Sequence, residues 1–102
     1  MKYINILIIN PDKSYINKIK KFLNNKNIKI FQAQNMREAL LLVIKNSIEI
    51  IIYDFYMPHF KNCEIIKILQ KNSMNKNISF TFISNSSEMI DLHTKISEKI
   101  TL

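Results

Sequence analysis

The chain has no glycine and only one cysteine, and none of its apolar runs reaches the length of a membrane span. The single cysteine, Cys63, excludes a scaffold held by intramolecular disulfides and fits a reducing compartment, where we expect it to be a small buried residue. The N-terminal apolar run covers only residues 6–9, which is too short for the core of a signal peptide. We therefore expect a cytoplasmic protein that does not use a membrane.

Negative charge is also scarce, because 8 acidic residues face 15 basic ones and leave a formal net charge of +7. Such an excess can indicate nucleic-acid binding, but Arg37 is the only arginine and the other basic residues are lysines. Lys, Ile and Asn all have AT-rich codons, so coding bias explains much of the lysine content. A charged surface affects solubility and non-specific binding before it forms a site. A small basic nucleic-acid-binding protein therefore stays an alternative, and we expect no specific nucleic-acid partner.

Apolar sequence is abundant, at 47% of 102 residues, which is enough for a single globular domain over residues 1–102. Short stretches rich in β-branched or aromatic residues predict four strands, at residues 3–9, 28–33, 50–53 and 79–83. A helix is predicted after each strand, and this alternation implies right-handed crossovers. The expected fold is therefore an α/β doubly wound parallel sheet in the order 2-1-3-4. Residues 100–102 would form at most a stub of a fifth strand, with no final helix.

Capping residues and helical spacing predict where the helices lie. Asp12 can cap a first helix at residues 12–24, and Asn35 can cap a second helix in which Glu38 returns a bond to the Asn35 amide. In a loop at residues 59–62, Asn62 is the residue best able to adopt a positive φ in a chain without glycine. The apolar positions that mark the second, third and fourth helices are Met36, Ala39, Leu40, Val43 and Ile44, then Ile65, Ile68 and Leu69, then Met89, Leu92 and Ile96.

The strand at residues 50–53 is apolar or aromatic throughout and ends on an acid, Asp54. Such a run is typical of a strand that is covered on both faces of a parallel sheet. Open α/β sheets bind ligands outside the carboxyl edge, so an acid placed there is better suited to chemistry than to packing. The first strand ends at Asn10 and the fourth is followed by Ser84. We expect Asp54, Asn10 and Ser84 to lie close together at this edge.

With these elements, the chain resembles the receiver domains of two-component response regulators over nearly its whole length. Residues 6–9 resemble the first strand of that family and residues 31–35 its second strand and turn. The stretch Asp54-Phe55-Tyr56-Met57-Pro58 resembles its phosphoacceptor segment. The resemblance implies that Asp54 is the phosphoacceptor, that Ser84 contacts the phosphoryl group, and that Asp54 and the backbone of Tyr56 help to hold magnesium.

The chain departs from the family where the metal would be held. Family members have two neighbouring acids at the end of the first strand, whereas this chain has Asn10 and Pro11. Magnesium prefers carboxylate oxygens, so Asn10 would be a weak ligand and Pro11 offers no side-chain ligand. If Asp12 were a metal ligand instead, its distance in sequence from Asp54 would no longer match the spacing in the family. We therefore expect Asp12 to be a helix cap. The lysine that the family places after Ser84 also has no match, so we expect Mg²⁺ to bind weakly if it binds.

Our leading hypothesis is a divergent receiver, or pseudo-receiver, that is not an enzyme and acts mainly through protein contacts, with Asp54 as a remnant or weak phosphoacceptor. The resemblance implies a histidine kinase, a phosphotransfer protein or an output protein as partner. Without a final helix the sheet face beside the first helix would be left partly open and apolar, so we expect it to be buried by a second copy, by a partner or by a collapsed C-terminal tail. A working magnesium-dependent phosphoacceptor that uses Asn10 is the competing hypothesis.

Ordinary structural roles are also open to the same residues. Asp54 could be a solvated loop residue or a cap, and Ser84 could bond to nearby backbone without any phosphate. A Cys63 nucleophile assisted by His59 or His93 has no support from spacing, because no acid, histidine and nucleophile are suitably arranged in the sequence.

Overall fold

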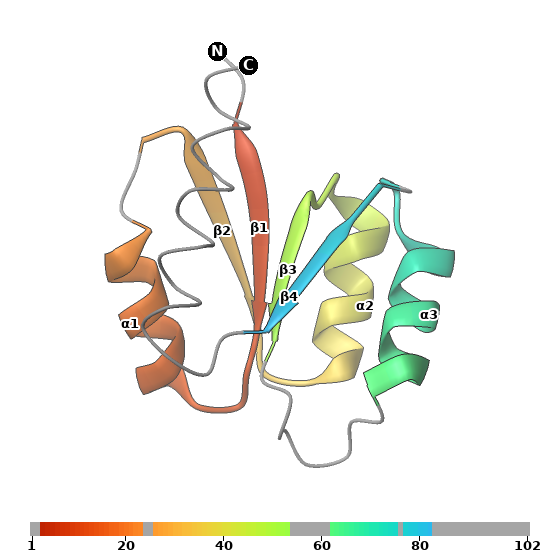
Figure 1. Cartoon of the computed structure of the whole chain (residues 1–102), viewed down its shortest axis with the longest axis horizontal. Coiled ribbons are helices and arrows are strands. Elements are labelled where there is room, and N and C mark those ends of the chain that lie inside the picture. The colour runs from red at the N-terminus through yellow and green to blue at the C-terminus, as the bar shows by residue number, and fades with distance from the viewer. Residues whose placement is uncertain (1–2, 24–25, 54–61, 76, 83–102) are drawn as a thin grey trace.

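The computed structural model describes residues 3–23, 26–53, 62–75 and 77–82, and every structural statement below concerns these residues. Strands and helices alternate along them (Figure 1). The strands are β1 (Ile4–Ile9), β2 (Ile28–Ala33), β3 (Ile50–Tyr53) and β4 (Ser79–Phe82). The helices are α1 (Lys13–Phe22), α2 (Met36–Lys45) and α3 (Asn62–Asn72).

All four strands form one parallel sheet in the order β2-β1-β3-β4, as the sequence predicted. The central strand β1 pairs with β2 on one side and with β3 on the other. Each strand agrees with its predicted range to within one residue. A helix joins each strand to the next, which is how parallel neighbours are connected.

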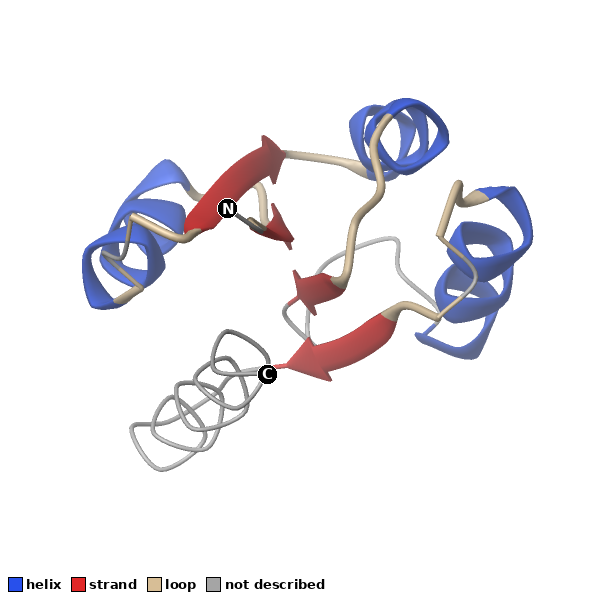
Figure 2. Ribbon diagram, turned by 90° about the horizontal axis from the view of Figure 1, so that it is seen from above, coloured by secondary structure: helices blue, strands red, loops and turns tan. Residues whose placement is uncertain are grey.

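The helices lie on both faces of the sheet, with α1 on one face and α2 and α3 on the other (Figure 2). On the first face, Ile16 and Ile19 of α1 belong to a core cluster with Ile6, Ile8 and Ile50. All five side chains are at most 2% exposed. Fully burying a side chain of this size contributes about 1.5–3 kcal/mol before entropy is counted. Ile6 and Ile8 of β1 face this layer, whereas Leu7 and Ile9 face the other one. This alternation fixes the register of the strand.

The second core cluster fills the space between the sheet and the α2/α3 layer. Val43 of α2 and Leu69 of α3 share this cluster with Leu7, Ile9 and Ile51. All five are 0% exposed. The predicted apolar faces of these two helices are therefore confirmed at Val43 and at Leu69.

Two positions of the predicted apolar stripes are wrong. Ile44 of α2 is 47% exposed and Ile68 of α3 is 42% exposed, so neither belongs to the core. Ile44 follows the buried Val43 and Ile68 precedes the buried Leu69, and neighbouring residues on a helix point in directions about 100° apart. Both side chains are consequently turned away from the sheet.

Two further expectations about local structure need correction. Asn62 is the first residue of α3 rather than a loop residue at positive φ. The helix simply begins earlier than its apolar positions suggested, and the first turn of a helix tolerates Asn. The sheet face beside α1 also differs from expectation, since Phe80 of β4 packs with the other cluster, against the α2/α3 layer.

Strand alternation explains the position of Phe80. In β4, Ser79 and Thr81 are the registered partners of Ile50 and Ile52, which face α1. The α1 side of β4 therefore carries two hydroxyl side chains among the described residues, and both are half-buried. Ile50 and Ile52 are 0% exposed, so both side chains are buried, and cover of this face by a second copy, a partner or the C-terminal tail stays a prediction.

None of the described helices is both long enough and apolar enough to cross a bilayer.

Candidate functional site at the carboxyl edge of the sheet

The carboxyl ends of the three strands that should carry the site lie side by side. Ile9, the last residue of β1, is the registered partner of Tyr53, the last residue of β3. Tyr53 is in turn the partner of Phe82, the last residue of β4. Asn10 and Asp54 are the next residues in sequence after Ile9 and Tyr53. The ends of β1, β3 and β4, after which the three site residues were predicted, therefore lie at one edge of the sheet.

Asn10 is the predicted site residue that the structure describes, and its backbone N–H and side-chain oxygen are both hydrogen-bonded. The side chain is only 4% exposed. Its backbone N–H donates to the Ala33 carbonyl at the end of β2, at 2.9 Å. Its Oδ1 accepts a hydrogen bond from the backbone N–H of Asp12 at 2.8 Å. This bond spans Pro11 and closes a turn of the kind that Asn side chains stabilise between a strand and a helix.

Asp12 begins α1 as its N-cap. The residue has an extended backbone, with φ −93° and ψ 110°, and its Oδ1 accepts from the backbone N–H of Ser14 at 2.8 Å. The side chain is exposed. The predicted capping role is confirmed, and this carboxylate oxygen is directed to the helix end. The two hydrogen bonds, from Asp12 to Asn10 and from Ser14 to Asp12, form one continuous link from β1 into α1.

The profile of the response regulator receiver domain matches residues 6–100 of the sequence. The chain belongs to this receiver domain family. No curated protein matches the sequence of this receiver domain.

Solved structures support the same fold. A CheY-like response regulator receiver domain protein from Methanospirillum hungatei JF-1 is 16% identical, with a TM-score of 0.74 over 98% of this chain and 95% of its own. An adenylate cyclase from Rhodopirellula baltica is 19% identical, with a TM-score of 0.68 over 95% of this chain and 70% of its own. A response regulator protein from Burkholderia pseudomallei, solved with a phosphorylated aspartic acid, calcium ion and citrate, is 17% identical. Its TM-score is 0.66, over 86% of this chain and 54% of its own, so this receiver domain spans about half of that protein.

The described part of this site does not fit a divalent cation. Asn10 offers a single uncharged side-chain oxygen, which already accepts the Asp12 amide, and Pro11 carries no ligand atom on its side chain. Across the described ranges there is no group of three or more His, Cys, Asp or Glu side chains that could hold a metal ion. Receiver domains commonly take such a cation, and the two residues that follow β1 here, Asn10 and Pro11, provide no carboxylate for one.

Several predicted site residues lie outside the described residues, and their roles stay predictions. These are Asp54, Tyr56 and Ser84, together with His59 and His93. The side chain of Cys63 also lies outside the description, although its backbone belongs to α3.

Sequence reasoning missed the hydrogen bond between Asn10 and Asp12. The signal was present in the order Asn10-Pro11-Asp12, because an Asn side chain readily accepts from the amide two residues later. The sequence also predicted one hydrogen bond wrongly in the capping box of α2. Asn35 Oδ1 accepts from the Glu38 N–H at 2.9 Å as expected, but the Glu38 carboxylate accepts from Gln34 N–H at 2.7 Å rather than from Asn35.

The capping role of Asp12 leads to a stability prediction. Asp12→Ala should lower the free energy of unfolding by about 1 kcal/mol, because the Ser14 amide loses its acceptor. Asp12→Asn is the matched control, since it keeps the acceptor oxygen and should cost no more than a few tenths of that value. Urea unfolding followed by circular dichroism measures both. A loss of magnesium binding in Asp12→Asn, with stability unchanged, would instead make Asp12 a metal ligand.

Proposed function

We propose that this chain is a divergent receiver of the two-component phosphorelay type, a pseudo-receiver that has lost efficient metal-dependent phosphorylation and acts mainly through protein contacts. Asp54 is its remnant or weak phosphoacceptor, and Ser84 is the residue placed to contact a phosphoryl group. A histidine kinase, a phosphotransfer protein or an output protein is the partner class that the family implies. The protein works in the cytoplasm as a single receiver-like domain.

The observation that carries this proposal is that the two residues after β1, Asn10 and Pro11, carry no negative charge. Phosphoryl transfer to a carboxylate depends on cationic groups that neutralise the phosphoryl oxygens, because the protein contributes mainly position and charge. Here the buried Asn10 amide is used to hold the turn into α1, and the following residue is Pro11. Neither supplies the negative charge that would hold a divalent cation beside Asp54. Each missing carboxylate lowers the attraction for a divalent cation by about a few kcal/mol, before the desolvation cost of that carboxylate is subtracted.

Protein contact remains available to such a chain, since the described sheet packs against helices on both of its faces. Both core clusters are formed by side chains that are at most 7% exposed. A domain that folds fully by its own packing can present fixed surfaces whether or not it is phosphorylated. The function of this chain therefore rests on its surfaces more than on its chemistry.

The test is phosphorylation by a small donor. Incubation of the unaltered chain with magnesium and acetyl phosphate should label Asp54 slowly or not at all, as read by intact-protein mass spectrometry. A receiver that retains both acids serves as the positive control, and Asp54→Asn is the negative control. Rapid labelling of the unaltered chain that Asp54→Asn abolishes would instead establish a working magnesium-dependent phosphoacceptor.

A further inference from the structure

Exposed apolar side chains gather on one layer of the molecule. Of the six large apolar side chains that are exposed among the described residues, four belong to α2, α3 and the turn that follows α3. They are Leu41 (50% exposed), Ile44 (47%), Ile68 (42%) and Met74 (59%). Scattered single apolar residues are normal on a protein surface, whereas a cluster indicates a site of interaction.

The four side chains are brought together by the way the two helices end. The backbone N–H of Met74 donates to the Val43 carbonyl at 2.9 Å, which joins the turn after α3 to the last turn of α2. Ile44 is the residue after Val43, and Leu41 lies one helical turn before Ile44. Ile68 belongs to the neighbouring helix, which contacts α2 directly. We call this surface, made by Leu41, Ile44, Ile68 and Met74, the α2/α3 patch.

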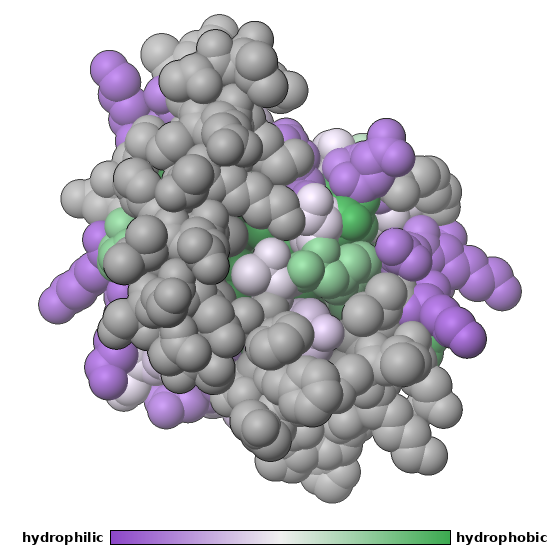
Figure 3. All heavy atoms as spheres, in the orientation of Figure 1, coloured by the Kyte–Doolittle hydropathy of each residue, from purple (hydrophilic) through white to green (hydrophobic). Residues whose placement is uncertain are grey.

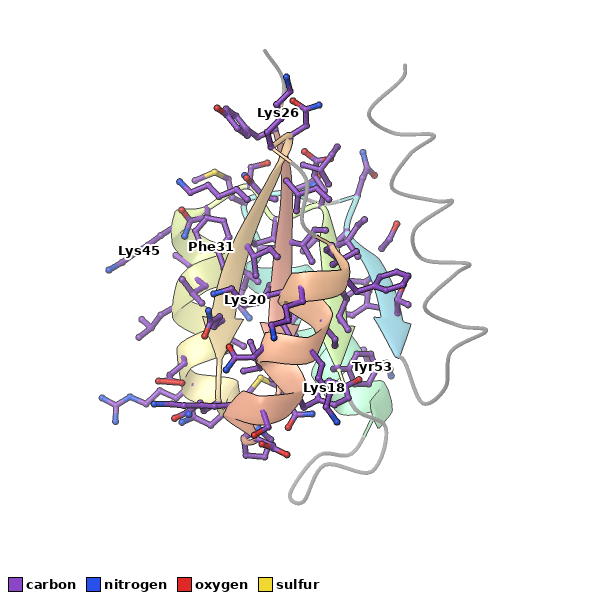
Figure 4. All side chains as sticks on the ribbon, turned by 90° about the vertical axis from the view of Figure 1, so that its left-hand side faces the viewer. Lys18, Lys20, Lys26, Phe31, Lys45 and Tyr53 are labelled. Atoms are coloured by element: carbon purple, nitrogen blue, oxygen red, sulfur yellow. The ribbon has the colours of Figure 1, made fainter. Side chains whose placement is uncertain are left out.

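Positive charge surrounds the α2/α3 patch. Lys45 and Lys71 lie in the last turns of α2 and α3, at the same end as Ile44 and Met74, and both are exposed. Arg37 and Lys67 add two more exposed cations on the same helices. Figure 4 shows Lys45 projecting away from α2, and Figure 3 shows hydrophilic side chains projecting at the side of the molecule where α3 lies. Two acids belong to these helices. Glu38 accepts a backbone hydrogen bond at the opposite end of α2, and Glu64 lies in the first turn of α3, at the end away from Lys71.

We propose that the α2/α3 patch is a docking surface for an acidic amphipathic helix of a partner protein. Two adjacent helices with exposed Leu and Ile offer the apolar contact that such a helix requires, at spacings that match its own i, i+3 and i+4 positions. The surrounding lysines complement acidic residues on its flanks and would steer its approach. This inference rests on the proposed role in protein contact and identifies the surface and the partner chemistry.

Other occupants fit the α2/α3 patch less well. A two-fold dimer would bring the same patch of each copy together, so the lysines around one patch, Lys45 and Lys71, would oppose those around the other. Single-stranded nucleic acid is held by stacking on aromatic side chains, and the sequences of α2 and α3 contain no aromatic residue. Duplex nucleic acid is held through its phosphates, to which the apolar side chains of the patch offer no contact. A membrane-bound helix needs a continuous apolar face, and that face of α2, which includes Ala39 and Val43, is already buried against the sheet.

The experiment uses the full chain and a designed probe. The probe is a peptide of about 20 residues with Leu at helical core spacing and Glu elsewhere, which is long enough to form a helix on binding. A control peptide has the same acidic residues but Gln in place of Leu. Two-dimensional NMR of the ¹⁵N-labelled chain should show saturable shifts at amides of α2, α3 and residues 73–75 with the first peptide only. Anionic lipid vesicles and a short DNA duplex are run in parallel.

Variants separate the apolar and charged contributions. Leu41→Gln with Ile44→Gln should weaken peptide binding at least about tenfold, because two half-exposed side chains no longer bury apolar area. Lys45→Gln with Lys71→Gln should weaken it about threefold to tenfold at low salt and less at high salt. Lys18→Gln with Lys21→Gln removes the same charge from exposed positions of α1, on the opposite face, and should leave the affinity within about twofold. All substituted positions are exposed, so circular dichroism should show unchanged folding.

Each outcome decides the proposal. Absence of binding by the amphipathic peptide, equal binding by its Gln control, or a larger effect of the α1 variant would overturn it. So would shifts of the patch amides by vesicles, by DNA or by self-association in preference to the peptide. Acetyl phosphate labelling of the same variants is the separate measurement for the proposed function. Rapid labelling of Asp54 with intact peptide binding would overturn the loss of phosphorylation and leave the docking surface standing.

Discussion

Replacing Asn10 and Pro11 together with aspartate should raise the rate of Asp54 labelling by acetyl phosphate at least about a hundredfold, and labelling should become magnesium-dependent. The two carboxylates restore the hard oxygen ligands and the negative charge that the β1 end lacks. The substitution is compatible with the local structure, because Asp at position 10 has the shape of Asn and can still accept the Asp12 amide that Asn10 now accepts at 2.8 Å.

A second readout of the same variant does not depend on labelling. Two added carboxylates near Asp54 repel one another without a cation, so the double variant should be less stable than the unaltered chain. Its unfolding midpoint should then rise with added magnesium, because an ion that binds only the folded state stabilises it. Adding Asp54→Asn to the double variant should remove the labelling. If the double variant folds, gains magnesium-dependent stability and is still not labelled, the missing acids are not the reason for the loss.

The second large effect is expected in the core. Leu7→Ala should lower the free energy of unfolding by about 3 kcal/mol, within the range of 2–5 kcal/mol that is usual for such a truncation. Leu7 is 0% exposed in the central strand β1, which has a neighbour on both sides, and it belongs to the cluster beneath α2 and α3. The cavity would form where the surrounding strands cannot easily collapse.

Leu41→Ala is the matched control for Leu7→Ala, because it removes the same atoms from a side chain that is 50% exposed on α2. It should cost less than about 1 kcal/mol. Urea unfolding of both variants gives the comparison. Similar losses at the two positions would contradict the assignment of Leu7 to the core and of Leu41 to the α2/α3 patch.

The arrangement of the sheet could be predicted from the sequence because its strands are short stretches rich in β-branched or aromatic residues, and the third is a continuous apolar run. Ile50 to Tyr53 forms such a run, and the observed β3 has the same bounds. The faces of the helices were harder to assign. Apolar residues make up 47% of the chain, so an Ile at helical spacing does not by itself indicate the core. Ile44 and Ile68 matched the spacing and are nevertheless exposed.

The candidate site was less predictable than the fold because it depends on individual hydrogen bonds. The sequence predicted Asp12 as a cap, which is confirmed, and Asn10 as a site residue, which stays a prediction. It did not indicate that the Asn10 oxygen accepts the Asp12 amide. Apolar periodicity carries no information about which acceptor a given amide finds. Such bonds follow from turn geometry, which here is set by Pro11 between the two residues. The roles of Asp54, Tyr56 and Ser84 stay predictions.

A magnesium titration of the unaltered chain tests the central claim most directly, with NMR shifts of the Asn10 and Asp12 amides and calorimetry as readouts. We expect no saturable binding up to about 10 mM magnesium, because the β1 end provides no carboxylate for the ion. The shifts that do occur should be small and should persist in Asp54→Asn. Saturable binding below about 1 mM that Asp54→Asn abolishes would show a functional metal site and would contradict the account.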